Sequence, residues 1–151
     1  MKRSSPLLLA GCLLALTGCV RSYRVADVRS RLDRTVSKID QATRETEADV
    51  AEMRKICEPL LSGHPPLREI LERLDATVVA LRSHQQEVAG LRRRLDQVAQ
   101  PEVCEDSPEG EQIRQLQADY TAIARKVEQT VERYKTDANQ LLAAVQQAQG
   151  R

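Results

Sequence analysis

The stretch that decides the fold is residues 111–149, EQIRQLQADYTAIARKVEQTVERYKTDANQLLAAVQQAQ. Its apolar side chains recur at steps of three and four residues, which is the spacing of one face of an α-helix and not the alternation of a strand. This stripe consists of Ile113, Leu116, Tyr120, Ile123, Val127, Val131, Tyr134, Ala138, Leu141, Val145 and Ala148. The stretch contains no proline, so it predicts one long helix.

Two earlier segments show the same pattern. Residues 67–99 carry an apolar stripe that only the polar Gln85 interrupts, and residues 22–58 carry a weaker stripe with Thr46 at one seam position. Neither segment contains a proline. Both therefore predict long helices, of which the first is expected to pack least tightly.

Proline and glycine concentrate in residues 59–66 and 100–110, which predicts loops between the three helices. Stripes sustained over about four or five heptads are typical of coiled coils and slender bundles. A helix of about 35 residues is about 50 Å long. The sequence therefore predicts an all-α fold, an elongated coiled-coil-like bundle of three long helices that run up, down and up.

The first residues have the order of a secretory signal. A basic start at positions 2–3 is followed by an apolar run over residues 6–16 and by small residues before Cys19. The run is shorter than the roughly 20 residues that a membrane-spanning helix needs. Its ending, Leu16-Thr17-Gly18-Cys19, resembles the lipobox of bacterial lipoprotein precursors, over these first residues only. The resemblance implies that residues 1–18 are a signal peptide and that a mature domain, residues 19–151, begins with Cys19 carrying the lipid.

A second match to the lipobox ends at Cys12, but cleavage there leaves an apolar core of about six residues, below the usual 7 to 15. Cys19 is therefore preferred, and an ordinary secretory peptide is the alternative. Several acyl chains on one cysteine, palmitate among them, tether a protein to the membrane permanently. Lipoproteins retained in the inner membrane commonly have Asp after the cysteine, where this chain has Val20. The resemblance thus implies an envelope protein on the outer membrane, facing the periplasm.

The composition argues against several classes of function. Aromatic residues make up 2% of the chain, with no Phe or Trp, so we expect no enclosed pocket for a cofactor or a small-molecule substrate. The 23 basic and 22 acidic residues create no net field that would attract nucleic acid. His64 and His84 have no partners at metal-ligand spacing. We therefore expect a protein that is not an enzyme, with no catalytic, cofactor-binding or metal-binding residues.

Charged clusters have simple interpretations. Consecutive helical positions point about 100° apart, so Arg92-Arg93-Arg94 predicts a solvent-facing helix segment and not one flat patch. The basic excess over residues 21–38 leaves two hypotheses open, contact with membrane headgroups at about 1 kcal/mol per cation or a solvated helical linker. The acidic residues over 102–111 favour the start of a helix through its dipole.

Cys57 and Cys104 are the thiols that remain after processing, and in an oxidising compartment they are candidates for a disulfide. A disulfide needs their α-carbons within about 7 Å, whereas an up-down-up bundle puts them at opposite ends. One solution is a bend near Ser83, which has capping-box spacing to Gln86. The other is pairing between parallel neighbouring chains, Cys57 with Cys57 and Cys104 with Cys104.

These features together favour a lipid-anchored helical spacer, adaptor or accessory subunit of an envelope assembly. Its partners would be the membrane, through the N-terminal lipid, and another protein or a second copy of itself, through the apolar helical seams. The alternative is a regulatory binding module that docks on an envelope enzyme or a cell-wall polymer through its loops.

Overall fold

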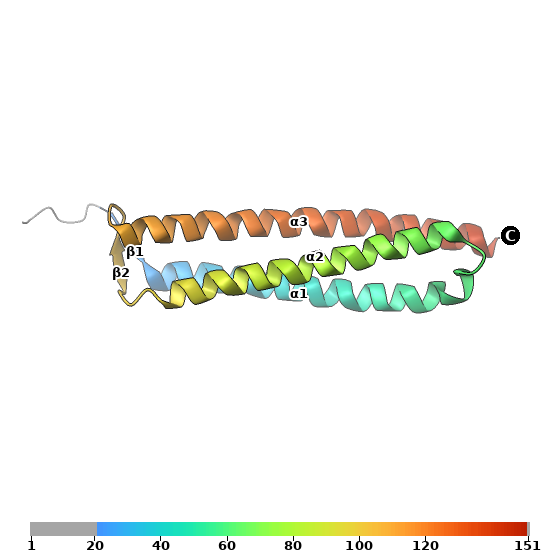
Figure 1. Cartoon of the computed structure of the whole chain (residues 1–151), viewed down its shortest axis with the longest axis horizontal. Helices are drawn as coiled ribbons and strands as arrows, with labels where there is room; N and C mark the ends of the chain where they lie inside the picture. The colour runs from blue at the N-terminus through green and yellow to red at the C-terminus, as the bar shows by residue number, and fades with distance from the viewer. Residues whose placement is uncertain (1–20, 151) are drawn as a thin grey trace, which may run out of the picture.

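The computed structural model describes residues 21–150 and is an elongated bundle of three helices, with a small sheet at one end (Figure 1). The helices are α1 (Val25–Cys57), α2 (Pro65–Asp96) and α3 (Pro108–Gln149), and the 3-10 turn η1 (Glu58–Leu60) follows α1. Strands β1 (Ser22–Arg24) and β2 (Glu102–Cys104) pair antiparallel. The predicted all-α, up-down-up bundle is confirmed. The predicted signal peptide and the predicted lipidation site, Cys19, lie outside the described residues.

Two helices begin a few residues before the start of their apolar stripes, at prolines that the sequence pattern assigns to the loops. Helix α2 begins at Pro65 and α3 at Pro108. Proline suits this position, since the first N–H groups of a helix have no partner within the helix and the ring already holds a helical φ. The Ser107 hydroxyl also caps α3 by accepting a hydrogen bond of 3.0 Å from the Gly110 N–H.

Helix α2 packs against both of its neighbours, and α1 and α3 touch each other least. In Figure 1, α2 crosses the rod diagonally, from below α1 at the left to the level of α3 at the right. Polar pairs at successive levels join α1 to α2 in antiparallel register: Arg29–Asp96 (3.2 Å), Asp33–Arg92 (3.4 Å), Asp40–Gln85 (2.9 Å), Glu47–Arg82 (2.6 Å) and Arg54–Asp75. Gln85, the polar break in the predicted stripe, thus bonds across the interface of α1 and α2.

The apolar core is divided into two clusters, one near the sheet and one near the opposite end, here called the tip. The buried residues between the clusters are polar: Thr43 and Thr46 on α1 and Thr77 on α2. The Thr43 hydroxyl donates to the Ile39 carbonyl at 2.8 Å, so its burial leaves no unpaired donor. Helices α1 and α2 therefore carry threonines, and no large apolar side chains, at the buried positions between the two clusters.

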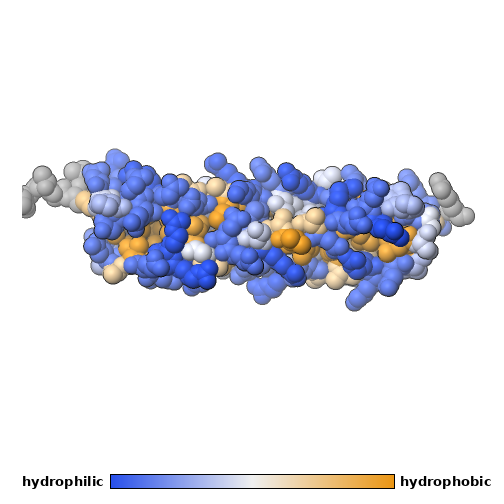
Figure 2. Space-filling model, viewed as in Figure 1, coloured by the Kyte–Doolittle hydropathy of each residue, from blue (hydrophilic) through white to orange (hydrophobic). Residues whose placement is uncertain are grey.

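The face seen in Figure 2 is mostly hydrophilic, with small apolar patches along it. Three large apolar side chains are exposed among the described residues: Ile56 (52%), Val79 (65%) and Leu142 (54%). Within residues 21–150, no helix has the length and the apolar character needed to cross a bilayer.

The predicted disulfide between Cys57 and Cys104 is wrong. Helix α2 continues unbroken past Ser83, and its 32 residues separate the two cysteines by about 48 Å. Cys57 is a free thiol at 1% exposure, which also disfavours its pairing with a neighbouring chain. The structure therefore does not join these two cysteines to each other.

Candidate functional site: a groove between α2 and α3

A groove with a volume of about 540 Å³ opens between α2 and α3 where the core is divided. Its walls are Arg73, Ala76, Thr77 and Ala80 from α2 and Thr130, Glu132, Arg133, Thr136 and Asp137 from α3. Alanine and threonine side chains are short, so the two helices do not fill the space between them at this level. The groove is thus a direct result of the small residues in the middle of the rod.

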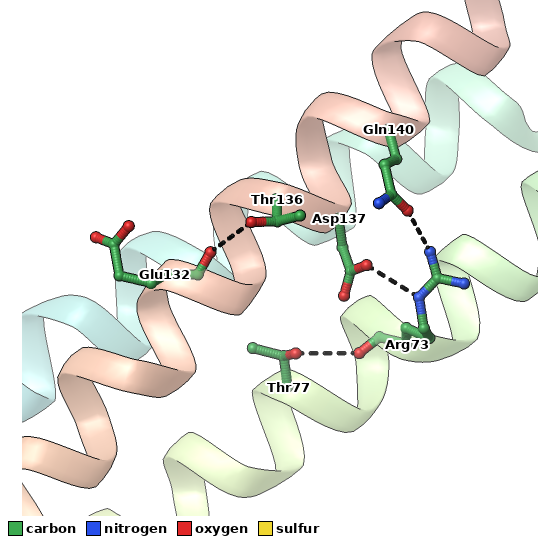
Figure 3. Close-up of polar contacts among 6 residues, drawn as sticks. All are labelled: Arg73, Thr77, Glu132, Thr136, Asp137 and Gln140. Carbon is green, nitrogen blue, oxygen red and sulfur yellow. Dashed lines mark hydrogen bonds and ion pairs between the residues drawn. The ribbon is translucent and has the colours of Figure 1, made fainter.

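Arg73 closes the end of the groove that lies toward the tip. Its Nε donates to Asp137 Oδ1 at 2.9 Å, and its Nη2 donates to Gln140 Oε1 at 2.7 Å (Figure 3). The Asp137 side chain is only 17% exposed, and hydrogen bonds between charged groups are stronger than neutral ones. These contacts hold α2 to α3 and leave both charges neutralised.

The threonine hydroxyls of the groove are bonded to their own helices. Thr77 donates to the Arg73 carbonyl at 3.1 Å and Thr136 donates to the Glu132 carbonyl at 3.1 Å, as Figure 3 shows. Thr130 donates to the carbonyl four residues earlier in the same way. When the hydroxyl of a threonine bonds to the preceding turn of its own helix, its methyl group is the part that can contact a binding partner. The groove therefore offers methyl groups and not reactive hydroxyls.

One charged side chain of the groove has no partner among the described residues. Arg133 on the α3 wall forms no ion pair or hydrogen bond with any residue from 21 to 150. An apolar floor with one uncompensated cation on its wall suits an amphipathic helix that presents small apolar side chains and a carboxylate.

The residues that the sequence singled out lie elsewhere. His64 precedes α2, and His84 Nδ1 lies 3.4 Å from Glu87 Oε1. In the described part of the chain, no three His, Cys, Asp or Glu side chains are placed to hold a metal ion.

The three consecutive arginines are divided between two neighbours. Arg92 pairs with Asp33 of α1 and Arg94 pairs with Asp119 of α3, while both arginine side chains remain about half exposed. The predicted solvent-facing segment is therefore correct in its exposure, but two of its arginines also join helices.

Tyr134 joins α3 to α1 and gives a test of the packing. Its hydroxyl donates to Asp49 Oδ2 at 2.8 Å, and burial together with this bond raises the pKa of Tyr134 to about 12. Because the folded pKa is raised, the stabilisation is complete below the ordinary pKa of about 10 and is lost as pH rises through about 12. The tyrosine absorbance of the protein and of the Tyr134→Phe variant is measured as a function of pH. The difference between the two titration curves should have its midpoint near pH 12. A midpoint near the ordinary value would contradict this packing.

Burial also governs the chemistry of Cys57, because it raises the pKa of the thiol, and only the thiolate is nucleophilic. We expect a thiol reagent to modify Cys57 at least about tenfold more slowly in the folded protein than in denaturant. The matched control is Ile56→Cys in a Cys57→Ser background, since position 56 is 52% exposed. Equal rates of modification at positions 56 and 57 would show that the end of α1 is accessible to solvent, and would contradict the burial of Cys57.

No protein-family model, curated protein or solved structure matches this chain. The groove was not predicted from the sequence because its residues carry no catalytic or ligand-binding signature. The feature of the sequence that could have indicated the groove is the presence of short side chains, Ala76, Ala80 and Thr130, at the middle of two helices that pack against each other.

Proposed function

We propose that this chain is a non-enzymatic lipoprotein of the bacterial envelope, a helical spacer or adaptor anchored to a membrane through Cys19. It binds a helix of a protein partner along the side of the rod. The observation that carries this proposal is the groove between α2 and α3, whose hydroxyls are bonded to their own helices and whose wall holds the unpaired Arg133.

The chemistry of the groove defines the partner. Small side chains allow a further helix to approach closely, and packing on two helices buries its apolar face as in a four-helix bundle. A carboxylate on that helix would lie opposite Arg133. Such a half-exposed ion pair contributes at most about 1 kcal/mol, so buried apolar area provides the affinity and the charge selects the orientation.

The lipobox resemblance supports lipid attachment at Cys19. Val20, which follows the cysteine in place of Asp, supports delivery to the outer membrane, with the rod in the periplasm. Each buried methylene of an acyl chain contributes about 0.8 kcal/mol, so several chains retain the protein at the membrane. The rod then holds its partner at a set distance from the bilayer.

Photo-crosslinking in cells tests the partner. A photoreactive residue at Ala80, in the groove, should give an adduct of defined mass, and the same probe at Gln41, on the exposed face of α1, should not. A second variant with Ala76→Arg should lose the adduct while keeping its helical circular dichroism. Equal adducts at both positions, or none at Ala80, would overturn the groove as the docking site. An adduct with an enzyme or a glycan would favour the regulatory binding module.

The anchor has its own test. Cys19→Ser should abolish lipid attachment and move the exported protein to the soluble fraction, whereas Cys12→Ser should leave both unchanged. Mass spectrometry without reduction should find diacylglyceryl on Cys19. A peptide pair that joins Cys19 to Cys104 in the mature protein would overturn lipidation at Cys19.

A further inference from the structure

The sheet ties the start of the described chain to the base of the bundle, the end that carries β1 and β2. Ser22 of β1 lies opposite Cys104 of β2. Beyond the strands, the Glu105 N–H donates to the Arg21 carbonyl at 3.1 Å, and the Val25 N–H donates to the Pro101 carbonyl at 3.0 Å. The backbone is therefore bonded in place from residue 21 onward.

The sheet is in turn fixed to the helices. Val103 of β2 is 1% exposed and packs in the cluster that includes Val25 and Ile113. The Ser107 hydroxyl donates to the Cys104 carbonyl at 2.7 Å and caps α3. The base of the rod is thus one packed unit of strands and helix ends.

Little chain separates this unit from the proposed anchor. Only Val20 and Arg21 lie between Cys19 and Ser22. A chain extends by at most about 3.6 Å per residue, so the α-carbon of Cys19 lies within about 11 Å of that of Ser22.

We propose that the rod is mounted directly on the bilayer, without a flexible linker, so that its base rests on the lipid headgroups. This inference rests on the proposed lipidation of Cys19. Helix α1 has 33 residues, so the tip is held about 50 Å from the membrane surface. Glu102, Asp106 and Glu109 are exposed at the base, and the cost of burying charge keeps the base on the headgroups and out of the acyl region.

This mounting places the docking groove at a defined height. Its α2 residues, from Arg73 to Ala80, lie 16 to 23 residues from Asp96 at the base end of α2, or about 24 to 35 Å at the helical rise. The partner must therefore present its helix in the aqueous compartment, above the bilayer.

Fluorescence quenching in vesicles tests the mounting. The lipidated protein is reconstituted into phosphatidylethanolamine and phosphatidylglycerol vesicles that contain some nitroxide-headgroup lipid. A fluorophore is attached at Gln97→Cys, at the base, or at Ser62→Cys, at the tip, both exposed positions. The protein without either substitution gives the background labelling of its own cysteines.

We expect the nitroxide lipid to remove more than half of the fluorescence at position 97 and almost none at position 62. A Gly/Ser linker of about 12 residues inserted between Val20 and Arg21, which spans about 20 Å, should sharply reduce the quenching at position 97. Equal quenching at both positions, or no effect of the linker, would overturn the direct mounting while mass spectrometry still shows lipid on Cys19. Absence of that lipid would instead overturn the proposed function.

Discussion

Replacing Gly110 with alanine is expected to destabilise the rod by about 1–3 kcal/mol, even though alanine is the better helix former. Gly110 lies in the first turn of α3 with β2 passing directly over it. An added Cβ would lie 2.1 Å from the Cys104 carbonyl oxygen and 2.6 Å from that of Glu105. Because both obstacles are backbone atoms, the strands must move away from α3. Urea unfolding followed by circular dichroism measures the loss.

Gly90→Ala is the matched control. Gly90 lies inside α2, and no atom outside its local backbone is within 4 Å of the position of an added Cβ. The same change should therefore stabilise the protein by about 0.4–1 kcal/mol, because alanine loses less backbone entropy in a helix. If both variants were stabilised, the close contact between β2 and α3 would be wrong.

Leu81→Ala is expected to cost about 2–5 kcal/mol in free energy of unfolding. Leu81 has no exposed surface and belongs to the cluster near the sheet. In a slender bundle, each level of the core holds few side chains, so a missing leucine leaves a cavity that its neighbours fill only in part. Thermal and urea unfolding of the variant should both show the loss.

The control for Leu81 is two residues away on the same helix. Val79 is 65% exposed, so Val79→Ala should change the free energy of unfolding by no more than about 0.5 kcal/mol. A large effect at Val79 and a small one at Leu81 would mean that α2 is rotated about its axis relative to this structure.

The helices could be predicted because their apolar residues are spaced locally. The stripes of residues 67–99 and 111–149 indicated which faces are buried, but the starts at Pro65 and Pro108 were placed too late and the end of α2 at Asp96 was placed three residues too late. The helix predicted from residue 22 begins at Val25, because residues 22–24 form β1. The two strands were missed because each is three residues long. One buried residue, Val103, gives no alternation that a sequence pattern could reveal.

The contacts between elements were beyond the sequence pattern. Asp40 and Gln85 are 45 positions apart, and Arg73 and Asp137 are 64 apart, and no local spacing links such pairs. The disulfide prediction failed for a related reason. Counting thiols favoured a bond between Cys57 and Cys104, but the unbroken α2 keeps them at opposite ends of the rod.

The division of the core also sets how the rod can open. The clusters on either side of Thr43 and Thr46 share no member, so separating the helices at the tip exposes only the apolar residues of that end. Such local unfolding costs less free energy than unfolding the whole chain. The tip can therefore fray and close again, with faster amide hydrogen exchange there, while the base and its sheet stay folded.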